Sequence, residues 1–224
     1  MKNGAHKISW ANEELTLLPE RALWWARQKT MFIADLHLGK AATFRNAGIA
    51  VPETGHDDDL ERLEKILKQY GAERLVVLGD FFHAKSGRTE STLTAFKNWR
   101  DRHPSLEMTL VIGNHDRHAG VPPDDWRIRC VTEPWTLPPF SCYHKPLETM
   151  RKDFALCGHV HPAFELYERS GLRAKSVCFY FQERIAILPA FGSFTGTHVI
   201  KPLHGEKFFL VVEGQIVDAS GTVK

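Results

Sequence analysis

Short apolar segments that end abruptly in polar residues constrain this 224-residue chain more than any other feature. Segments 29–34, 73–78 and 106–112 are rich in Val, Ile, Leu and Phe, and runs of this length predict buried β-strands. Each is followed at once by Asp, Gly-Asp or Gly-Asn, and the runs 140–143 and 153–157 lead in the same way into histidines. The sequence therefore predicts five strands that each deliver a chemically capable side chain at the carboxyl end.

Helical patterns lie between the first three of these predicted strands. Apolar residues recur at spacings of three and four within 57–70, and Gly71 follows as a predicted C-terminal cap. Within 89–102 they repeat every three residues until Pro104 ends the pattern. Strand and helix therefore alternate through the first half of the chain, which is typical of an α/β sheet.

The second half of the chain predicts mostly antiparallel strands, over 176–182, 184–188, 207–212 and 215–218. Glu213-Gly214 is a predicted hairpin turn between the last two. The N-terminal segments HKISW and ELTLLP are expected to add further strands. Because there is no internal repeat, low-complexity run or long Gly/Ser linker, the sequence predicts a single domain over 1–224.

Composition excludes several classes of protein. A hydrophobic content of 43% can fill a substantial core, and no stretch approaches the roughly 18–20 apolar residues of a membrane helix. The N-terminus lacks the apolar region of a secretory signal, so we expect a cytoplasmic protein with no membrane partner. The net charge is only +2, from 29 Lys and Arg against 27 Asp and Glu, so any contact with DNA must come from local clusters.

The cysteines are widely spaced and form no C-x-x-C pair: Cys130, Cys142, Cys157 and Cys178. At least three of them lie in apolar runs, where a free cysteine behaves as a small core hydrophobe. We therefore expect neither a disulfide framework nor a structural zinc site.

The polar residues at the strand ends are of the types that bind metals. In open α/β sheets, ligands bind beyond the carboxyl ends of the strands. Two carboxylates, one amide and four imidazoles are expected there: Asp35, Asp80, Asn114, His37, His144, His159 and His161. This mixture suits Mn, Fe, Zn or Co better than Ca or Mg. Seven donors fit two ions with a bridging carboxylate, the usual device for cleaving phosphate esters with a hydroxide nucleophile.

The same residues resemble the calcineurin-like metallophosphoesterase superfamily. The motifs D-x-H, G-D, G-N-H-D, a lone His and G-H-x-H occur in order, from Asp35 to His161. Five elements in order make the resemblance specific, although Tyr143 stands before the lone His where many members have Gly. The resemblance implies a four-layer α/β/β/α sandwich with the site at one edge of two packed sheets.

The resemblance also implies a role for each residue. One ion would be held by Asp35, His37, Asp80 and His161. The second ion would be held by Asp80, Asn114, His144 and His159. His115 would contact the phosphate and protonate the leaving oxygen, with Asp116 orienting its imidazole.

A narrower resemblance covers nearly the whole chain. The segments DLHLGKAATFRNAGIAVPETG, GDFFHAK and LPAFGSFTG are similar to the bacterial ligase-associated DNA-damage-response metallophosphoesterases. That family implies a DNA endonuclease or phosphodiesterase in DNA repair, two Mn²⁺ ions, and a DNA ligase, a nuclease and a helicase as partners. Nothing in the metal-ligand motifs distinguishes DNA from another phosphodiester.

Other charged and aromatic residues have less specific interpretations. Five cations follow the ligand loops and are expected to line the mouth of the site, or else to be ordinary solvated charges: Lys40, Arg45, Lys85, Arg88 and Arg117. His83 and His118 lie close in sequence to ligands and are candidates for supporting them. The run 57–59 is expected to offset a helix macrodipole rather than to bind metal.

Two other functions remain open from the sequence. A small-molecule phosphodiesterase or phosphatase, acting on a nucleotide or a lipid-sugar precursor, would use an identical metal site. A catalytically silent scaffold that kept the fold is a third hypothesis, against which the intact ligands and the His115-Asp116 pair argue.

Overall fold

The computed structural model describes residues 4–49, 55–146, 153–167, 173–201 and 203–222, which form two β-sheets. In the first sheet the strands lie in chain order, antiparallel up to β4 and parallel from β4 to β7. Its strands are β1 (His6–Trp10), β2 (Glu13–Leu18), β3 (Ala22–Trp25), β4 (Thr30–Ile33), β5 (Arg74–Val77), β6 (Glu107–Val111) and β7 (Ile128–Val131).

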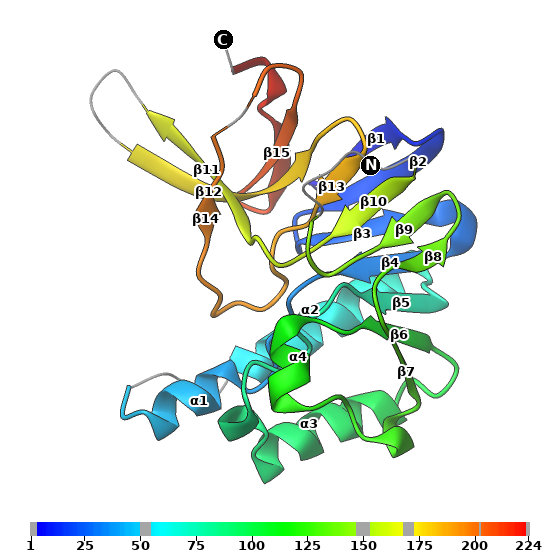
Figure 1. Cartoon of the computed structure of the whole chain (residues 1–224), viewed down its shortest axis with the longest axis vertical. Coiled ribbons are helices and arrows are strands. Elements are labelled where there is room, and N and C mark those ends of the chain that lie inside the picture. The colour runs from blue at the N-terminus through cyan, green and yellow to red at the C-terminus, as the bar shows by residue number, and fades with distance from the viewer. Residues whose placement is uncertain (1–3, 50–54, 147–152, 168–172, 202, 223–224) are drawn as a thin grey trace.

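The second sheet is built from the second half of the chain (Figure 1). Its order is β14-β11-β12-β13-β10-β9-β8, and β15 pairs with β12 and β16. β9, β10 and β13 are parallel neighbours, whereas β12, β15 and β16 pair antiparallel. The strands are β8 (Trp135–Leu137), β9 (Phe140–Cys142), β10 (Phe154–Cys157), β11 (Pro162–Tyr167), β12 (Arg173–Phe181), β13 (Ile185–Ile187), β14 (His198–Val199), β15 (Lys207–Val212) and β16 (Gln215–Asp218).

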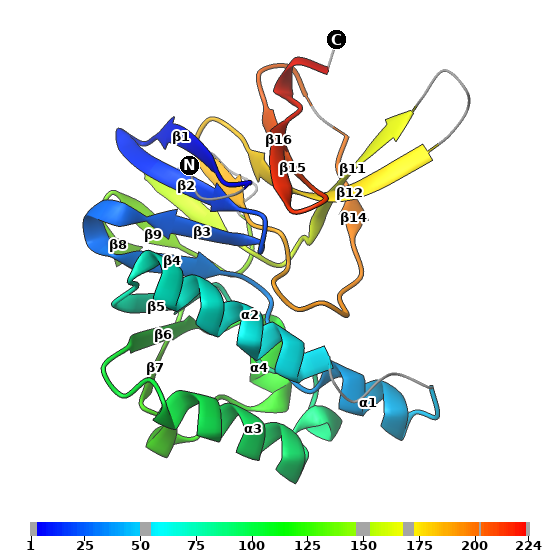
Figure 2. The ribbon, with the colours of Figure 1, turned by 180° about the vertical axis from the view of Figure 1, so that it is seen from behind.

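The helices lie mainly on the first sheet. Figure 2 shows α2 and α3 along its outer face, with α1 extending beyond it. The α-helices of the described residues are α1 (Lys40–Asn46), α2 (Gly55–Tyr70), α3 (Glu90–Asp101) and α4 (Asn114–Ala119). Short 3-10 turns are η1 (Ala26–Gln28), η2 (Lys85–Gly87), η3 (Asp124–Trp126) and η4 (Ser220–Thr222). None of the helices in the described residues has the length and apolar character needed to cross a membrane.

Alternating side chains divide the interior into three apolar layers. Along β4, Met31 and Ile33 belong to the layer that packs against α2 and α3, while Phe32 belongs to the layer between the sheets. In β12, Phe179 lies in the same inter-sheet layer, and its neighbour Tyr180 lies on the outer face of the second sheet. The strands that carry the site are therefore packed on both faces, which fixes where their ends lie.

The predicted elements are confirmed to within a few residues. The periodic segments form α2 and α3, and Gly71, with φ +64°, ends α2 as expected. Glu213 and Gly214, with φ +47° and +73°, form the turn between β15 and β16. The sequence did not predict β3, β7, β8, β11, β14, α1 or α4. The last two are too short, at seven and six residues, to show a helical period.

The structure confirms a mixed α/β fold with two sheets and helices. The α-helices of the described residues all end by Ala119. A third apolar layer contains Tyr180 and Phe208, and Phe164 of β11 and Ile200 pack against it. The four cysteines are free, and three are buried in the core.

We predict that Phe140 couples the two sheets. It is fully buried, and its ring centre lies 5.7 Å from that of Trp10, 4.9 Å from Trp25 and 6.5 Å from Phe32. Phe140→Ala should lower the free energy of unfolding in urea by about 3–5 kcal/mol. Val217→Ala, at a residue 45% exposed on the same sheet, should change it by less than about 0.5 kcal/mol. Similar values for the two variants would contradict this role.

Candidate metal centre

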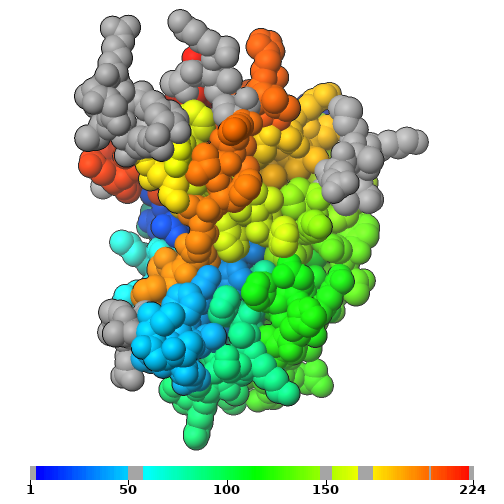
Figure 3. Space-filling model, turned by 60° about the vertical axis from the view of Figure 1, so that its left-hand side comes forward, coloured from blue at the N-terminus to red at the C-terminus, as the bar shows by residue number. Residues whose placement is uncertain are grey.

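The expected ligands lie at the carboxyl ends of strands from both sheets. β4, β5 and β6 are parallel, as are β9 and β10, so the residues that follow them emerge at shared edges. Backbone bonds join the first two loops, because Asp35 N donates to Gly79 O at 3.2 Å and His37 N to Asp80 O at 2.9 Å. The space-filling view shows blue, green and orange parts of the chain, far apart in sequence, side by side on one face (Figure 3).

Five of the seven expected ligands have a left-handed backbone conformation. The φ angle is positive at Asp35 (52°), His37 (49°), Asp80 (50°), His159 (71°) and His161 (52°). A non-glycine residue in this region costs about 1–2 kcal/mol. Such residues cluster at functional sites, where the surrounding structure holds them in place. The fold therefore stores strain at the positions that present these side chains.

Two motif glycines let a ligand side chain approach the backbone closely. A Cβ atom at Gly79 would lie 2.0 Å from His144 Nδ1, and Gly79 also has φ +82°. A Cβ atom at Gly113 would lie 2.2 Å from Asp80 Oδ1. Glycine is required at both positions because the neighbouring ligand occupies the place of a side chain.

Asp35, His37 and His161 form a first group, with ligand atoms within 4.8 Å of one another. His161 donates its Nδ1–H to the carbonyl of Gly196 at 3.0 Å, so the neutral ring keeps a lone pair on Nε2. That Nε2 lies 3.4 Å from His37 Nε2 and 3.5 Å from Asp35 Oδ1. Among the described residues, Asp35 Oδ1 is buried without a hydrogen-bond partner. His161 Nε2, His37 Nε2 and Asp35 Oδ1 therefore face one another, and no backbone N–H group in the described chain donates a hydrogen bond to Asp35 Oδ1.

Asp80, His144 and His159 form a second group by the same measure. His144 donates its Nδ1–H to the carbonyl of Leu78 at 3.0 Å, which leaves the lone pair of the neutral ring on Nε2. Around that nitrogen lie Asn114 Oδ1 at 2.9 Å, His159 Nδ1 at 3.1 Å and Asp80 Oδ1 at 3.4 Å. Two ligands bonded to one ion at about 2.0–2.2 Å are about 3.0–3.4 Å apart, so these spacings suit a shared ion.

Asp80 joins the two groups because its carboxylate oxygens face different ones. Oδ1 lies 3.4 Å from His144 Nε2, and Oδ2 lies 3.9 Å from His37 Nε2. Burial, with a contribution from nearby Asp35, raises the pKa of Asp80 to about 6. Burial and the neighbouring His161 lower the pKa of His37 to about 2, so its ring is neutral, as a metal ligand must be.

The residues present fit two divalent metal ions. Imidazole nitrogens with carboxylate and amide oxygens suit first-row transition metals. A buried carboxylate oxygen without a hydrogen bond, such as Asp35 Oδ1, is costly unless a cation faces it. The structure thus brings all seven expected ligands together in two groups around Asp80, and the binding of metal by them stays a prediction.

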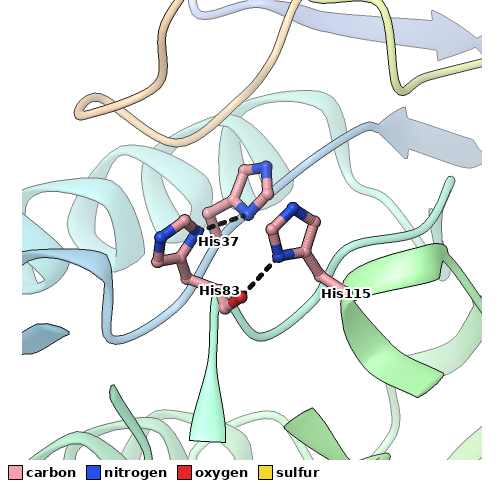
Figure 4. Close-up of side chains that lie close together, drawn as sticks. All are labelled: His37, His83 and His115. Carbon is pink, nitrogen blue, oxygen red and sulfur yellow. Dashed lines mark hydrogen bonds between the residues drawn. The ribbon is translucent and has the colours of Figure 1, made fainter. Parts of the chain in front are cut away.

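His115 lies beside these groups and is held by His83 (Figure 4). The backbone N–H of His115 donates to Asp80 Oδ1 at 2.9 Å, and its ring Nδ1–H donates to the carbonyl of His83 at 2.5 Å. The ring Nε2 lies 3.9 Å from Asp80 Oδ2, and 38% of the side chain is exposed. The His83 ring in turn places its Nδ1 3.4 Å from Nδ1 of His37. His83 therefore contacts both a ligand and the expected acid.

The ligand atoms of His37, His83 and His115 also lie within 4.8 Å of one another. The rings of His83 and His115 are stacked, however, with centres 5.2 Å apart and an angle of 22° between their planes. Because imidazole lone pairs lie in the ring plane, stacked rings direct them side by side rather than toward one point. This arrangement favours support of the neighbouring groups over a separate ion.

Asp116 has a different role from the one expected. Its Oδ1 accepts from the backbone N–H of Phe81 at 2.9 Å, and its Oδ2 accepts from that of Gly113 at 2.9 Å. These bonds hold the loop after β5 against the start of α4. The expectation that Asp116 orients the imidazole of His115 is therefore wrong, because the carbonyl of His83 accepts the Nδ1–H instead.

Lys40 and Arg45 lie on α1, and Lys85 lies on η2. These two elements together are called the rim of α1 and η2. The two elements are joined by the side chain of Asn46, which donates to the carbonyl of Ser86 at 3.1 Å. Lys40 begins α1 and lines a small pocket that His37 also lines. Burial lowers the pKa of Lys40, although Asp35 opposes the shift. The structure thus brings Lys40 close to the ligand groups and leaves Lys85 exposed farther along the rim.

Arg88 does not line the mouth of the site as expected. Its Nη1 donates to the carbonyls of Ala119 and Val121, each at 3.1 Å. Its guanidinium also lies 4.5 Å from the ring centre of Phe82. Arg88 therefore holds the chain beyond α4 in place. This is a tertiary contact, which no local sequence pattern predicts.

Glu133 supports the second group and was not predicted from the sequence. Its Oε2 accepts from the backbone N–H groups of His144 at 2.9 Å and Lys145 at 3.2 Å. Its Oε1 lies 3.7 Å from Nη2 of Arg117, so that this exposed cation, expected to contact substrate, is partly neutralised. Glu133 is 11 residues from His144, and no spacing rule connects them.

We predict that Gly79→Ala disrupts the second group through a steric clash. The new Cβ would meet the ring of His144, which must move. The variant should bind Mn²⁺ more weakly in a calorimetric titration, and its free energy of unfolding should fall by clearly more than the roughly 1 kcal/mol that a left-handed alanine costs by itself.

Gly71→Ala is the matched control. Gly71 also has a positive φ, of +64°, but no atom lies within 4 Å of the place that its Cβ would take. It should show only the conformational cost of alanine in the left-handed region, about 1 kcal/mol, with unchanged binding of Mn²⁺. Equal effects of the two substitutions would contradict the steric role of Gly79.

Comparisons with known proteins show which family the chain belongs to. The calcineurin-like phosphoesterase family matches residues 28–214. The crystal structure of Pseudomonas putida nuclease MPE superimposes with a TM-score of 0.82 and 37% identity, covering 96% of this chain and 99% of that one. Yfce, a phosphoesterase from E. coli, gives a TM-score of 0.43 and 14% identity, covering 87% and 99%. A comparison with curated proteins finds no match. This chain belongs to the calcineurin-like phosphoesterase family, whose members are metal-dependent hydrolases of phosphate esters.

Proposed function

We propose that this protein is a nuclease that hydrolyses phosphodiester bonds in DNA with two divalent metal ions, Mn²⁺ in particular. The proposal is carried by the two facing ligand groups, joined by Asp80, beside the partly exposed imidazole of His115. The nuclease MPE of Pseudomonas putida, 37% identical over 96% of this chain, supports a nuclease activity. Mn²⁺ accepts this mixture of imidazole and oxygen ligands.

The chemistry divides between the ions and the protein. When bound, two divalent ions activate a water nucleophile and offset the charge on the phosphoryl oxygens. His115 acts as the acid, because its Nδ1–H is held by the carbonyl of His83 and the exposed Nε2–H of the protonated ring is left to donate to the leaving oxygen.

Binding of DNA is assigned to the rim of α1 and η2. Lys40, Arg45 and Lys85 would contact backbone phosphates, and binding should weaken as salt rises. The net charge of +2 supplies little general attraction, so these local cations carry the contact. Arg88 is left out because its Nη1 donates to two backbone carbonyls beyond α4.

A role in DNA repair is the second part of the proposal. The segments that begin at Asp35 and Gly79, together with LPAFGSFTG, resemble the ligase-associated DNA-damage-response metallophosphoesterases. On that basis we propose a DNA ligase, a helicase and a further nuclease as partners in the same repair process.

The test is cleavage of plasmid and single-stranded DNA with Mn²⁺ or with EDTA. We predict cleavage only with the metal. His115→Ala should slow it by about 10²–10⁴-fold, the usual contribution of a general acid. Hydrolysis of bis-p-nitrophenyl phosphate should fall much less, because p-nitrophenolate leaves without being protonated. His204→Ala, at an exposed histidine outside the ligand groups, is the control and should leave both rates unchanged.

Three outcomes would contradict the proposal. Good hydrolysis of bis-p-nitrophenyl phosphate without any metal-dependent cleavage of DNA would indicate a small-molecule phosphodiesterase. Faster hydrolysis of p-nitrophenyl phosphate than of the diester would indicate a phosphatase. Unchanged cleavage of DNA by His115→Ala would show that His115 is not the acid and that the mechanism is different.

A further inference from the structure

We propose that Asp59, Arg62 and Ser193 form a positioning cluster, the Asp59 cluster, which fixes the first ligand group through the loop 190–196. The inference rests on the proposed metal-dependent function and concerns one of the two ions. Asp59 and Arg62 lie on α2, far from the ligands in sequence, and Ser193 lies in the loop. None of the three side chains is itself an expected ligand.

One side of the loop 190–196 contacts the first ligand group directly. Phe191 N donates to Ala34 O at 2.7 Å, and Gly192 N donates to Asp35 O at 3.1 Å, so the loop runs along the backbone of a ligand. Four residues later, the carbonyl of Gly196 accepts the Nδ1–H of His161 at 3.0 Å. The loop therefore touches two of the three residues in the group.

The loop is built tightly against the ligand segment. A Cβ atom at Gly192 would lie 2.4 Å from the carbonyl of Leu36, so only glycine permits this approach. The hydroxyl of Thr195 donates to the carbonyl of Gly192 at 2.9 Å and closes the turn that leads to Gly196. A shift of this loop would therefore move the acceptor that orients His161.

The other side of the loop is fastened to α2 by the Asp59 cluster. Asp59 Oδ2 accepts from Ser193 N at 3.0 Å, and Asp59 Oδ1 accepts from Ser193 Oγ at 2.5 Å. Arg62 donates to the carbonyl of Phe191, to Asp59 Oδ1 at 2.9 Å and to Ser193 Oγ at 3.3 Å. The guanidinium also lies 4.3 Å from the ring centre of Phe191.

Burial strengthens the electrostatic interactions within the Asp59 cluster. Asp59 is only 6% exposed, and the side chain of Arg62 is 24% exposed, so solvent screens their interaction less than that of an open surface pair. A buried carboxylate that loses its partners is costly. The bonds to Ser193 are thus a stable anchor for the loop.

The direct contacts between the loop 190–196 and the expected ligands lie in the first group, at Asp35 and His161. The Nδ1–H of His161 is held by the loop, and hydrogen bonds of this kind fix the tautomer and orientation of a ligand, typically worth about 10–100-fold in metal affinity. In the second group, His144 Nδ1–H is held by Leu78 O, and its backbone by Glu133. The geometry therefore points to a selective effect on one ion.

The experiment is titration of metal-free protein with Mn²⁺ by calorimetry, with electron paramagnetic resonance to detect a coupled Mn²⁺ pair. His161→Ala and Asn114→Ala identify which binding step belongs to which group. Asp59→Asn and Ser193→Ala should weaken the step lost in His161→Ala by about 10–100-fold, should leave the other step unchanged, and should reduce the signal of the coupled pair at limiting Mn²⁺.

Two further variants separate positioning from general stability. Glu64 also lies on α2 but forms its ion pairs with Lys68 and Arg102, away from the loop 190–196. Glu64→Gln removes these pairs and should leave both binding steps and the coupled signal unchanged. Ser193→Thr keeps the hydroxyl group and should restore the affinity that Ser193→Ala loses. Ser193 is exposed, so its variants are informative even if Asp59→Asn does not fold.

Three results would overturn the inference. They are unchanged affinities in Ser193→Ala, equal weakening of both steps, and selective weakening of the step that belongs to Asn114. Failure of the unaltered protein to bind two Mn²⁺ ions is a different result, because it would contradict the proposed function and the inference with it.

Discussion

The rest of the site depends on the placement of lone pairs on Nε2 of His161 and His144. Backbone carbonyls of Gly196 and Leu78 accept the other ring proton of each, so the free lone pairs face carboxylate and amide oxygens. Such atoms repel one another unless a cation lies between them. The left-handed φ angles of the ligands and the close approach of glycines maintain this unfavourable arrangement. The fold thus brings together donor atoms that suit divalent metal ions, with Asp80 facing both groups.

Each group of ligands draws on both sheets, so the site depends on how the sheets pack. Asp35 and His37 follow β4 of the first sheet, whereas His161 follows β10 of the second; Asn114 and His144 meet in the same way from β6 and β9. The inter-sheet layer around Phe140 and Trp25 therefore sets distances inside the site. Loss of packing there should reduce metal affinity as well as stability, although no side chain of that layer is itself an expected ligand.

The sequence predicted what depends on local pattern and missed what depends on tertiary contact. The short apolar strands, two long helices and the seven expected ligands at strand ends could be predicted because each is defined by neighbours in sequence. The predicted roles of Asp116 and Arg88 were wrong, because the partners of both side chains are backbone groups that only folding brings close. Glu133 and Asp59 were missed as supporting residues for the same reason, since one holds a loop 11 residues away and the other a loop 134 residues away.

The most direct test of the metal centre is anomalous diffraction from crystals of the protein soaked in Mn²⁺. We predict two peaks about 3.5–4 Å apart, one beside Asp35, His37 and His161 and one beside Asn114, His144 and His159, with Asp80 in contact with both. A single peak, or a peak among His37, His83 and His115 with none beside Asp35, would contradict the two-ion site.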